Sequence, residues 1–229
     1  MQEESRFSRS EQVLGPEHME RLRKTRVILF GCGGVGSWAA EALVRTGIGA
    51  ITLVDPDVVA PSNINRQLPA TTLTVGMPKV EVLAARLREI NPDCRIIARR
   101  ERYSADNAAE FPLEDFDYVI DAIDSVADKA SLILNATALR AVTLLSSMGA
   151  ARKIDPLRVR VAEFWDVKGC PLAAALRNRF KRSGQFPKRK FKCVFSDEVR
   201  QNSSPDGPNG SLMHITATWG LLLASLVIR

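Results

Sequence analysis

The chain has 229 residues, 45% of them hydrophobic, which is enough to bury a substantial core and excludes a mainly disordered protein. Its 32 Lys and Arg against 26 Asp and Glu give a formal charge of +6, which allows a nucleic acid as partner but says nothing about fold. The four cysteines are far apart and form no C-x-x-C pair, which argues against a structural zinc site or a disulfide framework.

The first part of the chain predicts a βαβ unit. An apolar run at 27–30 leads directly into glycines, a helix is expected over 37–45, and a second strand over 50–54. The polar connection at 57–77 is long for a compact domain, so we expect it to carry part of a functional site.

The alternation then continues. Pro78 opens a predicted helix, strands are expected at 95–98 and 118–122, a helix over 126–140 and a strand over 143–147. Repeated strand and helix segments of this kind predict an α/β fold with a doubly wound, mostly parallel, Rossmann-like sheet.

The pattern changes after Gly149. We expect a strand at 158–163 and a basic, partly mobile segment at 177–211, which together form a small C-terminal extension of one domain spanning residues 1–229. The apolar stretch 212–228 is interrupted by polar residues and falls short of a bilayer span, so a buried helix is favoured and no stable membrane insertion is expected. The polar start of the chain lacks a secretory signal, which indicates a cytoplasmic protein, with peripheral membrane contact through 212–228 left open.

A glycine-rich loop follows the first predicted strand. The sequence GCGGVGS contributes Gly31, Gly33, Gly34 and Gly36 in the order G-x-G-x-x-G, directly before a helix. Glycines here let backbone N–H groups approach a phosphate, and Asp55 follows the second strand where an acid accepts hydrogen bonds from ribose. A nucleotide site is predicted, although NAD and ATP would both satisfy it.

The long connection favours ATP. It holds Asn63, Arg66 and Gln67 in SNINRQ, and Lys79 follows in GMPK. Hydride transfer needs no cations beside the phosphates, whereas adenylation builds negative charge on the α-phosphate that fixed cations stabilise. We therefore interpret Arg66 and Lys79 as triphosphate contacts.

The segment DYVIDAIDS carries two acidic residues at the carboxyl end of its predicted strand. Asp121 and Asp124 suit Mg²⁺ that also binds substrate phosphates, with Asp124 as the expected metal residue. The alternative for Asp124 is an N-cap of the next helix.

These motifs resemble those of the ubiquitin-activating-enzyme-like adenylyltransferases over essentially the whole chain. The resemblance implies ATP as cofactor with Mg²⁺, a homodimer, and an arginine in RFSRSE, here Arg9, that reaches the partner subunit's nucleotide. It implies nucleotide contacts at the residues of the quoted motifs: Gly31, Gly33, Gly34, Gly36, Asp55, Asn63, Arg66, Gln67, Lys79, Asp124 and Ser125.

Within that family the chain most resembles the tRNA threonylcarbamoyladenosine dehydratases, through KCVFS and LAAALR. The sulfur-carrier activators commonly carry two C-x-x-C pairs, which are missing here. The resemblance implies that ATP adenylates the threonyl carboxylate of the modified nucleoside in the anticodon loop of tRNA. Ring closure then releases AMP, and positioning both groups on one nucleotide makes this step intramolecular.

Cys193 is the position where a thioester could form. We expect the neighbouring Lys188, Arg189, Lys190 and Lys192 to lower the pKa of its thiol. An ordinary thiol is the alternative, because cyclisation does not require a covalent enzyme intermediate.

The basic stretch 177–192 has Phe180, Phe186 and Phe191 between its charges. This composition suits phosphate contacts with stacking on unpaired anticodon bases, while a solvated charge run is the competing interpretation.

Three other functions stay open at this point. One is an activator of the C-terminus of a ubiquitin-like or sulfur-carrier protein, and another is an NAD-linked oxidoreductase, for which Arg66 and Lys79 would have no purpose. The last is a non-catalytic nucleotide-binding adaptor that receives sulfur-transfer partners, such as a cysteine desulfurase, through Cys193.

Overall fold

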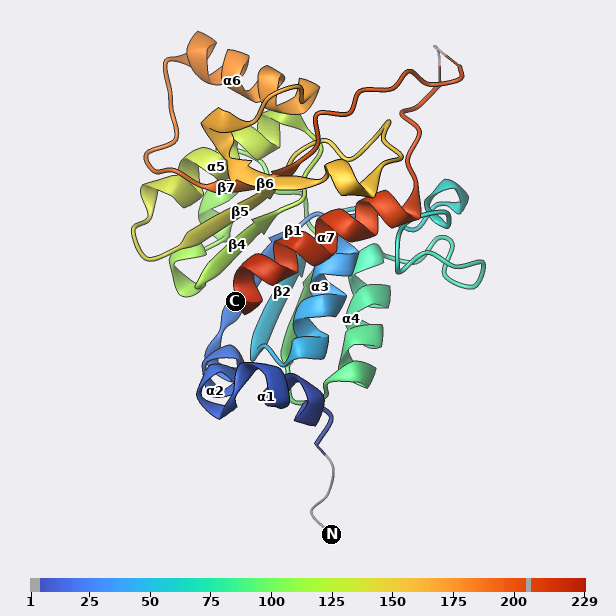
Figure 1. The fold of residues 1–229 in the computed structure, drawn as a ribbon, viewed down its shortest axis with the longest axis vertical. Helices are drawn as coiled ribbons and strands as arrows, with labels where there is room; N and C mark the ends of the chain where they lie inside the picture. The colour runs from blue at the N-terminus through green and yellow to red at the C-terminus, as the bar shows by residue number, and fades with distance from the viewer. Residues whose placement is uncertain (1–4, 205–206) are drawn as a thin grey trace.

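The computed structural model describes residues 5–204 and 207–229, and within them the chain forms one seven-stranded sheet (Figure 1). In chain order its strands are β1 (Arg26–Phe30), β2 (Ala50–Val54), β3 (Arg95–Arg99), β4 (Tyr118–Asp121), β5 (Thr143–Ser147), β6 (Arg160–Glu163) and β7 (Lys192–Phe195). Their order across the sheet is β3-β2-β1-β4-β5-β7-β6, and every neighbouring pair is parallel except β6 with β7. The predicted α/β, doubly wound and mostly parallel architecture is confirmed.

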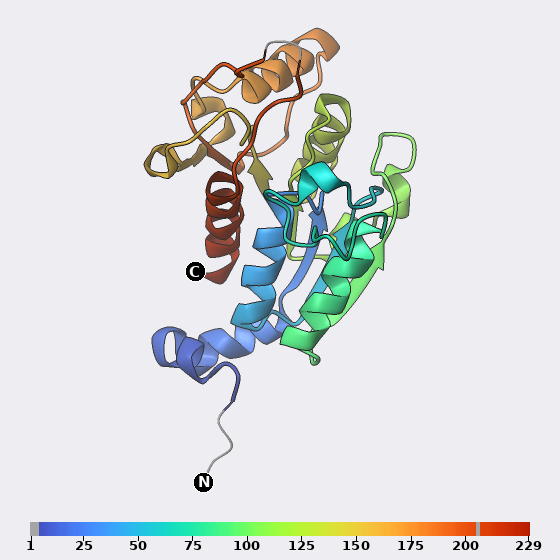
Figure 2. The same ribbon diagram turned by 90° about the vertical axis from the view of Figure 1, so that its right-hand side faces the viewer.

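Helices cover both faces of the sheet (Figure 2). α3 (Gly36–Thr46), α4 (Lys79–Ile90) and α7 (Met213–Ile228) pack on one face, and α5 (Val126–Ala138) and α6 (Pro171–Ser183) pack on the other. α1 (Ser8–Leu14) and α2 (Pro16–Lys24) lie near the amino ends of the first strands (Figure 1). Short 3₁₀ turns occupy Pro61–Asn63, Ala108–Glu110, Leu113–Asp115, Pro156–Arg158 and Phe164–Asp166.

The central strand β1 shows why both faces must be covered. Successive side chains of a strand point to opposite faces, and here Val27 and Leu29 join the core under α3 and α7 while Ile28 and Phe30 join the core under α5. All four are buried. A strand that is apolar on both faces is typical of a parallel sheet between two layers of helices.

The apolar stretch 212–228 is part of the core. It forms α7, in which Trp219 is fully buried, and α7 crosses α3 so closely that a Cβ added to Gly220 would lie 2.4 Å from the Val35 carbonyl oxygen. The buried-helix interpretation is confirmed. Among the described residues, no helix combines the length and the apolar character needed to cross a bilayer.

The basic stretch 177–192, in which no helix or strand was predicted, has regular structure at both ends. α6 continues to Ser183, and β7 begins at Lys192 between β5 and β6. The helix is stabilised by Ala173, Leu176 and Phe180, whose spacing places them on one buried face. Mobility of segment 177–211 stays a prediction, and its residues 205–206 lie outside the described part of the chain.

Candidate active site

A cavity of about 840 Å³ opens at the carboxyl ends of β1, β2, β4, β5 and β7. Most of the predicted site residues line it, namely Gly31, Gly33, Gly34, Asp55, Asn63, Arg66, Gln67, Lys79, Asp124 and Ser125. The loops that leave neighbouring parallel strands meet at this edge of the sheet, which is where α/β proteins bind their ligands. Segments more than a hundred residues apart in sequence therefore share one site.

The glycine loop turns sharply between β1 and α3. Gly31 has φ +92°, and a Cβ at this position would lie 2.6 Å from the Ala122 carbonyl oxygen. Gly36, which is buried, is held even closer, because its Cβ would lie 1.8 Å from the Gly31 carbonyl oxygen. Gly33 is open instead, with its nearest neighbour atom, Gln67 Nε2, 3.7 Å from an added Cβ. Thus Gly31 and Gly36 serve the turn, and Gly33 leaves room for a ligand.

Asp55 directly follows β2, and its carboxylate is fixed in place. Its Oδ2 accepts a hydrogen bond from the Cys32 backbone N–H at 2.6 Å, and its Oδ1 accepts one from the Asp57 N–H at 2.9 Å. Burial raises the pKa of this carboxyl, against the lowering effect of these two bonds. The acid is thereby oriented on the glycine loop, where the ribose of a nucleotide lies in this type of fold.

The connection after β2 folds into a tight turn around Asn63. The Asn63 Oδ1 accepts a hydrogen bond from the Ala60 N–H at 3.1 Å, so this side chain shapes the loop. Arg66 donates to the Ser62 carbonyl oxygen at 2.9 Å and to Asn65 Oδ1 at 2.8 Å. Neither partner is charged, so the arginine keeps its positive charge available to an anion in the cavity.

Gln67 and Lys79 reach the cavity from the interior. Gln67 is 8% exposed, and its Oε1 has no hydrogen-bond partner among the described residues. Such an orphaned buried acceptor is uncommon, and its place at the cavity leaves it able to accept from a ligand or an ordered water. Lys79, the first residue of α4, is 5% exposed, and its Nζ lies 2.7 Å from Asp57 Oδ2.

The two acids after β4 have different roles. Asp121 is fully buried, with an ion pair of 2.8 Å to the buried Lys129 and a hydrogen bond of 2.6 Å from the Ser146 hydroxyl. The expectation that Asp121 supplies a metal ligand is wrong, because both of its oxygens are already engaged inside the protein. Asp124 is exposed and lines the cavity.

The N-cap alternative for Asp124 is wrong. Ser125 caps α5 instead, with its hydroxyl accepting from the Asp128 N–H at 3.5 Å. A short hydroxyl side chain at this position suits the non-helical backbone of an N-cap. Asp124 is therefore left with its carboxylate in the cavity.

Cys193 lies outside the cavity. It is fully buried on β7, between β5 and the edge strand β6, and burial raises the pKa of its thiol well above the usual value. The expectation of a lowered pKa is wrong, because neighbours in sequence on a strand point to opposite faces: Lys192 is exposed while Cys193 packs inside. A buried neutral thiol is a weak nucleophile.

Several members of the basic stretch have structural tasks. Arg189 donates to the Thr137 carbonyl oxygen at 3.1 Å and to the Val142 carbonyl oxygen at 2.7 Å, which satisfies carbonyls at the end of α5. Phe180 and Phe191 are core residues, at 0% and 5% exposure, so the prediction that they stack on bases is wrong. Phe186 is 46% exposed, with its ring 6.4 Å from that of the exposed Trp165.

Arg9 is far from the cavity of its own chain. It lies exposed on α1, and the start of that helix adjoins Gly47, at the carboxyl end of α3. The glycine loop is at the other end of α3, which at 11 residues is about 16 Å long. Arg9 can thus act only at another molecule's site, and its reach into a partner subunit stays a prediction.

Sequence reasoning missed three buried charged residues at the cavity: Asp128, which pairs with Arg102, and Lys153 and Glu198. The last two lie on the β5 and β7 side. They follow the carboxyl ends of β5 and β7, the position where ligands bind in α/β sheets. That rule alone would have indicated Lys153 after the predicted strand at 143–147. Glu198 could not be found, because β7 was not predicted.

Comparison with known proteins agrees with this geometry. The model of the ThiF family matches residues 7–229. The chain belongs to the ThiF family. One ThiF-family relative, the tRNA threonylcarbamoyladenosine dehydratase of Bacillus subtilis, is 43% identical over 192 residues, covering 84% of this chain and 74% of the relative. The Escherichia coli enzyme of the same name is 37% identical over 98% of this chain and 92% of its own length.

Solved structures extend the ThiF-family match to three dimensions. The E. coli tRNA N6-threonylcarbamoyladenosine dehydratase TcdA in complex with AMP superposes with a TM-score of 0.90 at 40% identity, over 97% of this chain and 92% of that one. The same protein in complex with ATP gives 0.88 at 38% identity, over 97% and 92%. E. coli MccB with ATP, at 18% identity and a TM-score of 0.64, shares the fold.

Proposed function

We propose that this protein is an ATP-dependent tRNA threonylcarbamoyladenosine dehydratase, which cyclises the modified nucleoside through an acyl-adenylate of its threonyl carboxylate. The observation that carries the proposal is the match, over nearly the full length of both chains, to an enzyme of that name solved with both ATP and AMP. The cavity supports it, because a glycine loop, an oriented acid and two cations meet there.

The nucleotide is proposed to lie along the β1 and β2 side of the cavity. Backbone N–H groups around Gly33 bind its phosphates, and Asp55 accepts hydrogen bonds from the ribose hydroxyls. Arg66 and Lys79 stabilise the charge that builds on the α-phosphate, with Lys79 exchanging Asp57 for a phosphate oxygen. A donor group of the nucleotide would satisfy Gln67 Oε1.

Mg²⁺ fits the acid side of this cavity. Magnesium in nucleotide sites usually takes one or two carboxylates and fills its other positions with phosphate oxygens and water. Asp124 supplies such a carboxylate, exposed at the cavity, since Asp121 is engaged with Lys129. When bound, the ion would neutralise phosphate charge; Asp124 would hold it, and Ser125 would keep the start of α5 in place.

The reaction needs no enzyme nucleophile. A threonyl carboxylate oxygen attacks the α-phosphorus and pyrophosphate leaves with the electron pair of the broken P–O bond. A carbamoyl atom of the same nucleoside then attacks the activated acyl carbon, AMP leaves with the C–O electron pair, and the displaced proton passes to solvent. The residues of the cavity therefore act by positioning and by charge stabilisation.

The tRNA is proposed to approach over α6 and the segment that follows it. Exposed cations lie there, namely Arg179, Lys181, Arg182, Lys188 and Lys190. Trp165 and Phe186 add exposed rings beside these charges, a combination suited to unpaired bases of the anticodon loop. A homodimer completed by Arg9, and a sulfur-transfer or cysteine desulfurase partner, are expectations that rest on the family resemblance.

One experiment tests the proposed function. The protein is incubated with ATP, Mg²⁺ and tRNA that carries threonylcarbamoyladenosine, and mass spectrometry of the nucleosides follows the loss of one water. The control replaces ATP with an analogue whose α–β bridging oxygen is a methylene group, which blocks pyrophosphate release and should leave the nucleoside unchanged. The proposal is overturned if the protein is folded and binds ATP but the mass of the nucleoside does not change. A parallel incubation with a sulfur-carrier protein tests the alternative, through pyrophosphate release.

A further inference from the structure

The cavity has a second wall, away from the glycine loop. Arg152 and Lys153 come from the loop after β5, and Glu198 comes from the loop after β7. β5 is two strands from β1, and strands are about 4.8 Å apart, so this wall lies roughly 10 Å along the sheet edge from the glycine loop. A nucleotide bound on the β1 and β2 side leaves this wall for the other reactant.

Within the described part of the chain, Lys153 is a buried cation that forms no ion pair, since the nearby Glu198 carboxylate is engaged with backbone N–H groups. It is 4% exposed, its Nζ donates to the Glu198 backbone carbonyl oxygen, and no acidic side chain of the described residues forms an ion pair with it. Burial lowers the pKa of this lysine. A buried ammonium is costly unless it is paired, so its place in the cavity calls for an anion.

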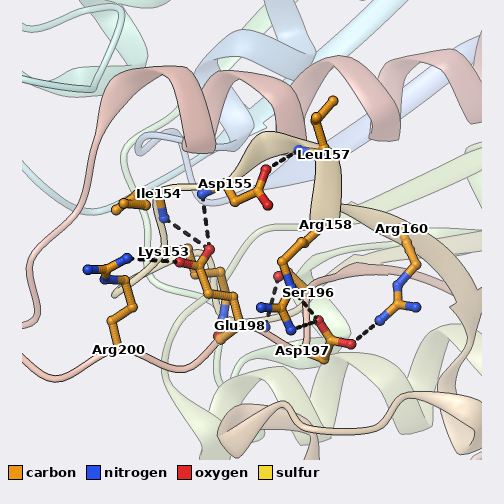
Figure 3. A network of polar contacts seen from close by, with 10 residues as sticks. All are labelled: Lys153, Ile154, Asp155, Leu157, Arg158, Arg160, Ser196, Asp197, Glu198 and Arg200. Atoms are coloured by element: carbon orange, nitrogen blue, oxygen red, sulfur yellow. Dashed lines mark hydrogen bonds and ion pairs between the residues drawn. The ribbon is translucent and has the colours of Figure 1, made fainter.

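The backbone around Lys153 is held from two sides. The Glu198 Oε2 accepts hydrogen bonds of 3.0 Å from the N–H groups of Ile154 and Asp155 (Figure 3). Glu198 thus makes two kinds of contact with the loop after β5. Its side-chain carboxylate accepts from the loop backbone, and its backbone carbonyl oxygen accepts from Lys153. The loops after β5 and β7 are tied together at the residue that faces the cavity.

Arg152 shows that this backbone is under strain. Its φ of +59° is the one positive value found at a non-glycine residue in the described ranges. Its N–H donates to the Gly210 carbonyl oxygen at 2.8 Å, and its own carbonyl accepts from the Arg200 N–H at 3.2 Å. Unfavourable backbone conformations of this kind persist where surrounding contacts enforce them, and they concentrate at functional sites.

The other cations of the cavity differ from Lys153 in their partners or in their burial: Arg152, beside it on the same wall, also forms no ion pair with a described residue but is only partly buried. Lys79 pairs with Asp57 at 2.7 Å, and Arg102 pairs with Asp128 at 2.8 Å. Arg66 lies in the connection after β2, on the nucleotide side. Lys153 is therefore the buried cation that remains for an anion on the β5 side.

We infer that Lys153 binds the carboxylate that is to be adenylated, and that Glu198 is the residue that positions it. The inference rests on the proposed function, which supplies a substrate carboxylate. The substrate carboxylate must approach the α-phosphate, and both groups are anions. In a low-dielectric site their repulsion is large unless a cation lies between or beside them. Lys153 supplies that charge from the side opposite Lys79.

Binding without ATP tests this assignment directly. Two labelled anticodon stem-loop RNAs are compared by fluorescence anisotropy, one with threonylcarbamoyladenosine and one with unmodified adenosine at the same position. The wild-type protein should bind the modified RNA more tightly, by about tenfold to a hundredfold, the usual effect of a hydrogen bond to a charged group. Lys153→Met should remove this difference while the affinity for the unmodified RNA and for ATP stays unchanged.

Matched variants separate binding from structure. Arg158→Met removes a cation of the same network, paired with Asp197 at 2.7 Å outside the cavity, and should keep the discrimination (Figure 3). Glu198→Ala frees the loop and should give a smaller loss than Lys153→Met. The melting temperature of Lys153→Met should not fall, because the variant removes an unpaired buried charge. Lys153→Gln, whose amide can still donate to the Glu198 carbonyl, should lose discrimination equally and serves if the Met variant does not fold.

The outcomes distinguish this inference from the proposed function. A wild-type protein that dehydrates the nucleoside but binds both RNAs equally overturns the role of Lys153, as does a Lys153→Met variant that keeps the discrimination. Loss of ATP affinity in that variant would mean that Lys153 contacts phosphate instead, which also overturns it. A wild-type protein that binds the modified RNA preferentially without dehydrating it contradicts the proposed function alone.

Discussion

The two sides of the cavity are built in different ways. On the β1 and β2 side, the turn around Asn63 and Arg66 is shaped by hydrogen bonds between residues three or four positions apart in sequence. Longer-range bonds, from the Cys32 N–H to Asp55, from Trp38 to the Arg66 carbonyl oxygen and from Asn65 to the Ser211 carbonyl oxygen, then tie the segments together. On the β5 and β7 side, Lys153 and Glu198 are 45 residues apart and hold each other. The first side presents backbone N–H groups, an oriented acid and two cations, and the second presents a buried cation that forms no ion pair with the residues described.

This difference matches two different tasks: binding ATP, which many enzymes do, and recognising one particular substrate. Binding ATP needs a turn, an oriented acid and cations, all of which a short stretch of chain can supply. Recognising one acyl acceptor needs groups placed by the tertiary structure. We therefore expect changes on the nucleotide side to abolish folding or ATP use, and changes on the acceptor side to alter which substrate is used.

The largest effect is expected from the glycine loop. Gly36→Ala should destabilise the protein by about 3 kcal/mol or more in urea unfolding, since overpacking that moves backbone exceeds the usual range for an added methyl group. The reason is the 1.8 Å approach of its Cβ to the Gly31 carbonyl oxygen. Gly33→Ala is the matched control: its Cβ has room, so it should fold normally but bind ATP more weakly. Equal stability of both variants would contradict this account.

Removal of a phosphate contact should come next. Lys79→Ala should lower kcat/KM for dehydration by about a hundredfold to a thousandfold, as expected for a group that stabilises developing charge. Measured ATP affinity should fall as well, while the affinity for tRNA should not. Lys129→Ala provides a contrast, because its ion pair with Asp121 is fully buried and its loss should lower stability first. A Lys79→Ala variant with full activity would remove this residue from the nucleotide side.

A moderate effect is expected on the RNA surface. Phe186→Ala should weaken tRNA binding by about 1 to 3 kcal/mol, the value of one base stacked on an aromatic ring. ATP affinity should be unchanged. Val13→Ala, an exposed apolar residue on α1 away from the cavity, is the control and should bind tRNA normally. If both variants bind alike, the tRNA does not contact the ring of Phe186.

The smallest effect on activity is expected at Cys193. Cys193→Ala should cost roughly 1 to 2 kcal/mol of stability through a small cavity in the core, with dehydration per folded molecule nearly unchanged. The buried thiol, with its raised pKa, does not reach the cavity. Loss of turnover without loss of stability would instead support the covalent route. The same variant tests a role of Cys193 in sulfur transfer. Any sulfur transfer by the wild-type protein should continue in Cys193→Ala.

The nucleotide side could be predicted from sequence because its signals are local. G-x-G-x-x-G, the acid after the next strand and the cations of SNINRQ and GMPK all fall within 49 residues, from Gly31 to Lys79, and all of them line the cavity except Gly36. On the acceptor side, of Lys153 and Glu198 only Lys153 follows a predicted strand, and the part built on β7 could not be predicted. Positive charge between Arg177 and Lys192 hid the helical spacing of Leu176 and Phe180, and the short run of β7 gave no sign that it inserts between β5 and β6.

The closeness of α7 to the glycine loop has a consequence for synthesis of the protein. Gly34 meets Thr216, and Gly220 meets Val35, so the loop is covered by a helix that is made much later. During translation, an emerging chain that contains the whole nucleotide motif still exposes the apolar side of α3 until residues 213–228 have left the ribosome. We expect chaperones that bind apolar segments to bind the nascent protein at this stage, and ATP to bind only after α7 has packed against the loop.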